Sequence, residues 1–214
     1  MGKPMEYFNT DVPEYRKAIW NYVCFDPEGE QDVNVPFERF RPSGFIDCMT
    51  TQTSRPRSGP RNEEQEREDD DYAIQRAFFT SYGKTWWMKT QAIYLPNGMV
   101  PHVFFTSIAQ NDNGVINISG IEEELERVLN DYMLPGNISP AIYGDEIYIA
   151  STVLVKRNGA QDRLHDRMTA ARVDIEHCFG SCNNLFARLT VKHTWKLCFM
   201  RHYVKTHLFS IFLC

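Results

Sequence analysis

The pattern of apolar and polar positions in the first half of the chain predicts three adjacent β-strands. Residues 44–48 form a short apolar run that is interrupted by one acid, Asp47. Residues 86–94 are rich in strand-forming side chains, and after a Pro-Asn-Gly turn at 96–98 the pattern returns over 99–105. The last two segments predict a hairpin beside the first strand. Their aromatic side chains are expected to fill the core, with stacking on nucleic-acid bases as the alternative.

Residues 119–132 have the pattern of an amphipathic helix that crosses over the sheet. Ser119 and Glu122 have the spacing of a capping box, and the Pro-Gly pair at 135–136 is expected to stop the helix. Residues 141–145 then predict a fourth strand, which ends in an acid. The apolar positions of the helix recur at steps of three and four residues: Ile121, Leu125, Val128, Leu129 and Tyr132.

A last long helix carries an apolar stripe that is predicted to pack on the sheet. Glu176 borders this stripe, one turn beyond Arg172, whereas Asp174 lies about 200° around the helix from Glu176. Glu176 is therefore the acid expected to face the strand ends. The helix completes an order of elements β-β-β-α-β-α, which predicts an α/β fold with helices flanking a mixed sheet. The stripe consists of Met168, Ala171, Ile175, Phe179, Cys182 and Phe186.

The rest of the chain divides into an extension, one domain and a polar insertion. Residues 1–43 are predicted to be an N-terminal extension with one helix around 13–23, and they contain no convincing DNA-reading motif. Residues 44–214 are long enough to form one domain with a substantial core. Segment 50–71 is too polar and too rich in breakers to pack, so it predicts an exposed loop, acidic over about 55–72.

Three acids lie at edges of the predicted core: Asp47, Asp145 and Glu176. Asp145 is preferred over Glu146 because Gly144 lets the backbone end the strand tightly. A carboxylate at a core edge is costly unless a partner neutralises it. Since the sequence builds no obvious Arg or Lys in beside each acid, hard divalent cations are the expected partners. The alternative is that these acids are surface caps or members of ion pairs.

The net charge of −5 is unusual for a nucleic-acid enzyme, but it is unevenly distributed. Residues 63–71 contain seven acids and one Arg, whereas residues 156–214 contain ten Lys or Arg and four Asp or Glu. The C-terminal region is therefore the candidate surface for a polyanion, with an ordinary solvated basic face as the alternative.

The six cysteines contain no Cys-x-x-Cys pair and predict reduced intracellular thiols rather than a disulfide framework. Cys178 and Cys182 share a helix face and His193 follows, so a zinc site is the alternative to simple packing. No apolar run approaches the 18 or so residues that a membrane span needs.

The ordered motifs resemble the DDE (Asp-Asp-Glu) nuclease domain of PIF/Harbinger-type transposases and their domesticated relatives. The resemblance extends from about Gly44 to Leu213. Where the family commonly has a His-Asp pair after the hairpin, this chain has Asn111-Asp112. The motifs are Gly-Phe-Ile-Asp-Cys at 44–48, Arg55-Pro56, Lys84, Lys89-x-Gln91, Pro96-Asn97-Gly98, Tyr143-Gly144-Asp145, and Arg172-x-x-Ile175-Glu176-x-x-Phe179-Gly180 with Phe186 beyond it.

The resemblance implies an RNase H-like fold and two-metal phosphoryl transfer on DNA. Asp47, Asp145 and Glu176 would bind two Mg²⁺ or Mn²⁺ ions, although which acid bridges them stays open. It also implies a nuclear protein that a separate Myb-like protein brings to DNA, without a membrane; the oligomeric state stays open, a homo-oligomer included. The rival hypothesis is a domesticated or decayed copy that acts as a non-catalytic DNA- or chromatin-interaction module.

Overall fold

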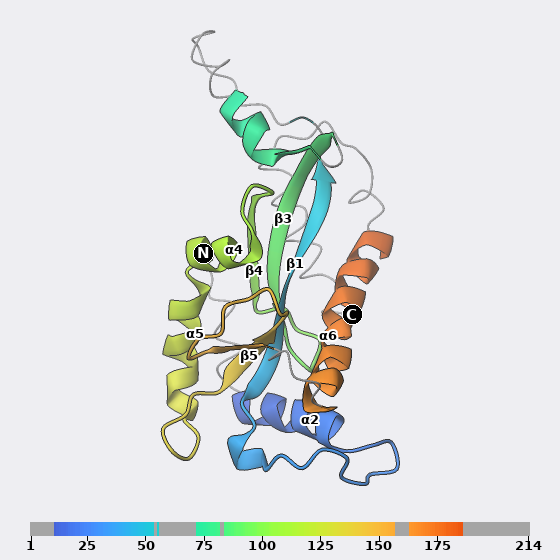
Figure 1. Ribbon diagram of the computed structural model, residues 1–214, viewed down its shortest axis with the longest axis vertical. Helices are drawn as coiled ribbons and strands as arrows, with labels where there is room; N and C mark the ends of the chain where they lie inside the picture. Colours follow the sequence, from blue (N-terminus) through green and yellow to red (C-terminus); the bar gives the residue numbers. More distant parts are fainter. Residues whose placement is uncertain (1–10, 54, 56–71, 82–83, 157–162, 186–214) are drawn as a thin grey trace.

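A single mixed β-sheet runs through the molecule, with helices on both of its faces (Figure 1). The computed structural model describes residues 11–53, 55, 72–81, 84–156 and 163–185, and at 174–176, 178, 179 and 181–185 it describes the backbone alone. The predicted α/β class with flanking helices is confirmed. The strands are β1 (Pro42–Thr53), β2 (Phe79–Thr80), β3 (Thr85–Tyr94), β4 (His102–Ser107), β5 (Ala141–Gly144) and β6 (Leu154–Lys156).

The long strand β1 lies between the two halves of the sheet, whose order is β2-β3-β1-β5-β6, with β4 also paired to β3. β3 is antiparallel to β1 and to β4, so the predicted hairpin and its place beside the first strand are confirmed. On the other side, β5 runs parallel to β1 and β6 runs parallel to β5. The sheet is therefore antiparallel on one side of β1 and parallel on the other.

The helices divide between the two faces of the sheet. α4 (Asp112–Ser119) and α5 (Ile121–Leu129) lie on one side, and α6 (Arg163–Leu185) lies along β1 on the other, with α2 (Val12–Cys24) at its lower end (Figure 1). Two short 3-10 turns, η1 (Phe37–Arg39) and η2 (Asn130–Tyr132), follow α2 and α5. Within the described ranges, no helix has both the length and the apolar character that crossing a bilayer requires.

Alternation along β1 distributes its side chains between two cores, as expected for a strand covered on both faces. Ile46 packs with α5 residues and with Ile142 of β5, whereas its neighbour Phe45 packs with α2, with Tyr143 and with the start of α6. Met168 and Ala171 are 1% and 6% exposed, which confirms the described part of the predicted stripe on the last helix.

The crossover helix differs from the prediction because it is two helices. Ser119 ends α4 and does not cap the helix that follows; its hydroxyl has two acceptors within reach of its one proton, Gln91 Oε1 at 3.1 Å and the carbonyl oxygen of Ile116 at 2.9 Å. Gly120 separates α4 from α5 in a left-handed conformation (φ +64°) that glycine adopts without strain. The predicted capping box at Ser119 and Glu122 is therefore wrong.

The predicted loop from residue 50 onward begins too early. β1 continues through Thr53 because its polar second half pairs with β3, where Thr51 lies opposite Met88 and Thr53 opposite Trp86. Both threonines are buried, and β-branched side chains suit such a position. Residues 72–78 are helical, while 56–71, which hold most of the acidic run, lie outside the described residues.

The predicted helix around 13–23 is α2, and it packs into the main core rather than apart from it. Val12 and Tyr15 join the α5-side cluster, while Ile19 and Val23 join the α6-side cluster. Arg16 donates to the carbonyl oxygens of Phe40 and Phe37, which ties the helix to the segment leading into β1. The boundary at residue 43 between extension and domain stays a prediction.

Candidate functional site

The sheet register places Asp47, in the middle of β1, beside Asp145, which follows the end of β5. β1 and β5 are parallel, and Phe45 lies opposite Tyr143. Asp47 lies two residues beyond Phe45, and Asp145 lies two residues beyond Tyr143, directly after β5 ends. Adjacent strands are about 4.8 Å apart and side chains alternate between faces, so both acids belong to the face that carries Phe45 and Tyr143. That is the α6 face of the sheet.

Asp47 is paired with an arginine from α6. Arg172 Nη1 lies 2.5 Å from Asp47 Oδ2, and the two side chains are only 12% and 15% exposed. The other oxygen of Asp47, Oδ1, accepts a hydrogen bond from the backbone N–H of Cys48 at 2.8 Å. The expectation that Asp47 has no basic partner is therefore wrong, because the partner is 125 residues away in the sequence.

Arg172 also borders the small pocket that contains Asp145. This pocket of about 150 Å³ is lined by one acid from the strand end, its neighbour in the turn, and residues of α6. Its position at the carboxyl end of parallel strands is where open α/β sheets commonly bind ligands. The lining residues are Tyr143, Gly144, Asp145, Glu146, Thr169 and Arg172.

A tight turn after β5 fixes the backbone at Asp145. Asp145 Oδ1 accepts from the N–H of Glu146 at 2.6 Å, and the N–H of Tyr148 donates to the Asp145 carbonyl oxygen at 3.1 Å. A Cβ at Gly144 would lie 2.5 Å from Cδ2 of Tyr148, so only glycine fits there. The glycine before Asp145 is therefore required by packing, while the choice of Asp145 over Glu146 stays a prediction.

Asn113 of α4 holds the far side of this turn and was not expected from the sequence. Its side-chain NH₂ donates to the carbonyl oxygen of Ile147 at 2.7 Å, and its Oδ1 accepts from the N–H of Ile149 at 2.8 Å. An amide that bonds one loop segment through both donor and acceptor restrains its backbone. No short-range signal indicates this role, because the loop is more than thirty residues further along the chain.

The third predicted acid, Glu176, is at a position of α6 one turn beyond Arg172. Residues four apart lie on nearly the same face of a helix, whereas position 174 is rotated by about 200° from both. Arg172 contacts Asp47, so the face of α6 that carries position 172 is turned toward β1 there, and the choice of Glu176 over Asp174 stays a prediction. The side chains of Asp174 and Glu176 lie outside the described set.

The opposite face of β1 carries a second polar group of residues beneath the site. The Tyr148 hydroxyl contacts Cys48 Sγ at 3.5 Å, and Lys89 forms an ion pair with Asp112 at 2.6 Å. Burial raises the pKa of Cys48 to about 12, so its thiol stays protonated and cannot serve as a nucleophile near neutral pH. We therefore assign these residues a structural role. The carboxylate of Asp112 is paired with the ammonium group of Lys89.

A buried polar network joins β3, β4 and α4. Gln91 Oε1 accepts from the Ser119 hydroxyl at 3.1 Å and lies 3.3 Å from Nε2 of His102. Burial lowers the pKa of His102 to about 4, opposed in part by Glu124. His102 is therefore neutral at physiological pH.

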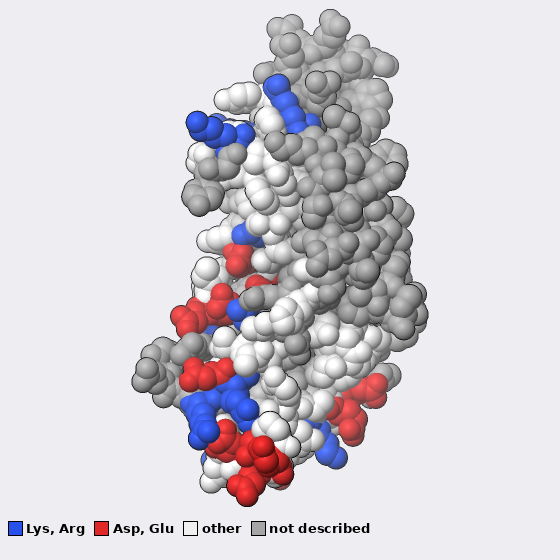
Figure 2. Space-filling view, turned by 90° about the vertical axis from the view of Figure 1, so that its right-hand side faces the viewer, with Lys and Arg blue, Asp and Glu red and all other residues white. Residues whose placement is uncertain are grey.

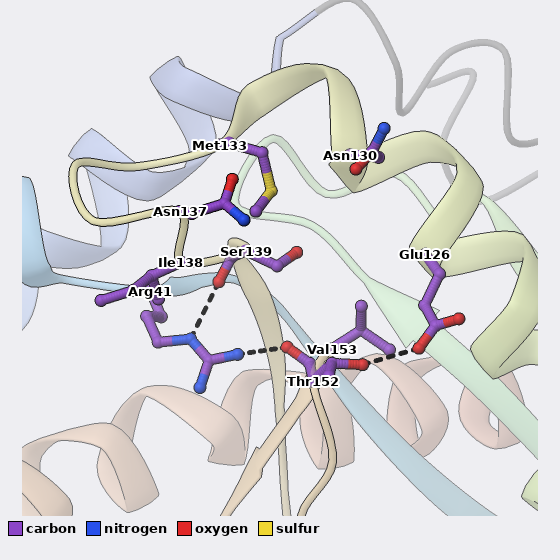
Figure 3. Close-up of a pocket in the computed structure, with 9 residues that line it drawn as sticks. All are labelled: Arg41, Glu126, Asn130, Met133, Asn137, Ile138, Ser139, Thr152 and Val153. Carbon is purple, nitrogen blue, oxygen red and sulfur yellow. Dashed lines mark hydrogen bonds between the residues drawn. The ribbon is translucent and has the colours of Figure 1, made fainter.

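A larger pocket than the one at Asp145 lies at the other end of the parallel strands (Figure 3). It has a volume of about 440 Å³. Arg41 donates to the carbonyl oxygens of Ser139 and Thr152, and the Thr152 hydroxyl donates to Glu126. These bonds join the segments that precede β1, β5 and β6 to α5. The polar groups of this pocket are thus engaged in holding strand beginnings together, far from Asp47 and Asp145.

Charges of both signs alternate on the described part of the α6 side (Figure 2). Among described side chains this face has no continuous basic surface. Residues 186–214, which contribute half of the basic residues counted in the C-terminal region, lie outside the described part, as does His193 of the alternative zinc site. The side chains of Cys178 and Cys182 are likewise not described, and no group of three His, Cys, Asp or Glu gathers among those that are.

Comparison with protein-family models, with curated proteins and with solved structures finds no match to this chain. The geometry at Asp47, Asp145 and Arg172, together with the sequence resemblance, is therefore the basis for any functional assignment.

Proposed function

We propose that this protein is a divalent-metal-dependent DNA endonuclease of transposase type, with an Asp-Asp-Glu site formed by Asp47, Asp145 and Glu176. The observation that carries the proposal is the position of two carboxylates on one face of the sheet, each two residues beyond the last pair, Phe45 and Tyr143, of the parallel strands β1 and β5. In this proposal, DNA is the substrate, a Myb-like protein delivers the chain to it, and the site of action is the nucleus.

The strand order supports an RNase H-like fold as the finer description of the sheet. A hairpin antiparallel to β1 lies on one side and the parallel strands β5 and β6 lie on the other, so the end of β5 lies beside the middle of β1. α6 then crosses the same face. The first two acids come from neighbouring strands and the third from this helix, which is the distribution that the family resemblance implies.

The side chains at the site fit divalent cations of the Mg²⁺ and Mn²⁺ type. The donors are carboxylate oxygens, which these hard ions prefer, and no thiol or neutral imidazole is among the three proposed ligands. Bound ions would supply Lewis-acid stabilisation of charge on the phosphate and would activate a water or a 3′-hydroxyl.

The contribution of the protein is a rigid placement of the ligands. Asp47 lies in the middle of β1, which pairs on both sides, and Asp145 is held by the turn that Gly144 and Asn113 define. Both acids are therefore fixed by the fold before substrate arrives, which lowers the cost of organising a charged site.

The test is single-turnover nicking of duplex DNA in Mn²⁺ by the parent and by Asp145→Asn. Asn keeps the shape of the side chain but removes its charge, so the expected result is a loss of nicking by at least about a hundredfold with an unchanged fold. Glu123→Gln, at an exposed carboxylate of α5 on the other face of the sheet, is the matched control and should nick like the parent. Equal nicking by Asp145→Asn and the parent would refute the assignment.

A non-catalytic DNA- or chromatin-interaction module is the second candidate, and the Arg172–Asp47 ion pair is the observation that favours it. An acid neutralised by arginine needs no metal for its stability. This candidate predicts that neither Mg²⁺ nor Mn²⁺ raises the melting temperature, whereas a metal site predicts a rise that grows with ion concentration.

A further inference from the structure

We propose that Arg172 is a built-in counter-cation that neutralises the acidic site when no divalent ion is bound and releases Asp47 when one binds. This inference rests on the proposed function and concerns the regulation of the same site. It makes ion binding and the Arg172–Asp47 contact mutually exclusive.

The first step is the closeness and burial of the contact. At 2.5 Å, with side chains 12% and 15% exposed, the guanidinium and the carboxylate are in direct contact and largely shielded from water. Electrostatic attraction is stronger in such surroundings than at an exposed surface. A competing cation must therefore break this ion pair, and the energy of the pair opposes its binding.

The second step is that Arg172 contacts one acid and borders the pocket of the other. It contacts Asp47 and lines the pocket that contains Asp145. Carboxylates on adjacent strand ends repel each other when no cation lies near them. One guanidinium at this point lowers that repulsion, as a divalent ion would.

The third step is chemical exclusion. A guanidinium has only donors and stays protonated, so it cannot become a metal ligand. A divalent ion on Asp47 Oδ2 would bring a second positive charge to the atom that Arg172 now contacts. Ion binding at this oxygen therefore requires Arg172 to withdraw, and the energy of the contact is subtracted from the affinity for the ion.

The consequence is that neutralising Arg172 should strengthen ion binding, the opposite of what removing an ordinary supporting residue does. The experiment titrates Mn²⁺ into the full chain by calorimetry, with thermal melts in chelator and in Mn²⁺, for the parent, Arg172→Gln and Arg172→Lys. The matched control is Arg163→Gln on the first turn of the same helix, where Arg163 pairs with Asp32 at 2.7 Å and is 71% exposed.

Arg172→Gln is expected to melt at a lower temperature in chelator, because Asp47 loses its counter-charge. It is also expected to bind Mn²⁺ about ten- to a hundredfold more tightly, the range that one charge-assisted hydrogen bond represents. Arg172→Lys keeps the charge on a more flexible side chain, so its affinity for Mn²⁺ should be intermediate between that of Arg172→Gln and that of the parent. Arg163→Gln should match the parent in Mn²⁺ affinity.

Equal or weaker Mn²⁺ binding by a folded Arg172→Gln would overturn the inference and make Arg172 a positioning residue for Asp47. If Arg172→Gln does not fold, the test uses Arg172→Lys instead. A Mn²⁺ affinity of Arg172→Lys no higher than that of the parent would then overturn the inference. Absence of Mn²⁺ binding in the parent and in every variant would overturn the metal site itself. Binding by Arg172→Gln but not by the parent would support both proposals.

Discussion

Replacing Gly144 with alanine is expected to destabilise the protein by distorting the turn that holds Asp145. A Cβ at this position would lie 2.5 Å from Cδ2 and 3.1 Å from Cγ of Tyr148, and 3.2 Å from Cγ2 of Ile46. Tyr148 and Ile46 are 1% and 0% exposed, so neither side chain can move into open space. The added methyl group must therefore shift the aromatic ring or the backbone.

The magnitude follows from the size of this overlap. Adding a methylene-sized group to a well-packed core costs about 1–3 kcal/mol, and a contact below 3 Å to a buried ring puts Gly144→Ala near the upper limit. For a protein of this length, 1 kcal/mol corresponds to a change of roughly 2–4 °C in the melting temperature. We therefore expect the melting temperature of Gly144→Ala in chelator to fall by about 6–12 °C.

Two further variants distinguish this overlap from a general effect of replacing glycine. Gly180 lies within α6, and a methyl group added there would meet no atom of the described residues outside its own helix backbone within 4 Å. Gly180→Ala should therefore be neutral or stabilise by up to about 1 kcal/mol. Combining Gly144→Ala with Tyr148→Leu should cost less than the sum of the two single changes, because the smaller side chain removes the overlap. Additive costs, or a Gly144→Ala protein as stable as the parent, would refute the reasoning.

Two other predictions concern the last helix and the buried histidine. Glu176→Gln should abolish Mn²⁺-dependent nicking while Asp174→Asn leaves it near the parental rate, measured in single turnover; the reverse result would show that the helix phase is wrong. The pKa of His102 is lowered to about 4 in the folded state. The neutral imidazole therefore contributes stability above the unfolded pKa of about 6.5, and this contribution, on the order of 1–3 kcal/mol, is lost as the pH falls toward about 4. Urea unfolding of the parent and of His102→Gln between pH 7 and pH 4 should give a flatter profile for the variant, and parallel profiles would contradict the assignment.

The elements that the sequence predicts well are those with strong local signals. The strand-forming residues and the Pro-Asn-Gly turn identify the hairpin of β3 and β4, and the apolar run before Asp145 identifies β5. The helical stripe identifies α6, in which its first two positions, Met168 and Ala171, are buried. Each of these signals lies within one helix, one strand or one hairpin.

The parts that the sequence does not predict depend on tertiary partners. The second half of β1 looks polar, yet Thr51 and Thr53 are buried because Met88 and Trp86 of β3 lie opposite them. Ser119 has the spacing of a capping residue, but Gly120 ends one helix there and begins the next. Local pattern alone cannot distinguish a buried polar strand from a loop, or a capping serine from the last residue of a helix. The contacts that decide come from other strands and helices.

The Arg172–Asp47 pair is the case in which a missing partner changes the functional argument. The sequence-based reasoning for metal ions assumed that the acids lack basic partners, and for Asp47 that assumption is wrong. A buried ion pair is nevertheless a poor device for stability alone, because well-packed apolar residues of similar volume stabilise as well or better. An apolar residue at position 47 would also remove the repulsion that Asp47 exerts on a second acid at the end of β5. Because an apolar pair would stabilise the fold at least as well, the presence of both acids beside one arginine indicates that the acids have a function that apolar residues could not provide. Binding of a cation that competes with Arg172 is such a use, and the affinity of Arg172→Gln for Mn²⁺ measures it directly.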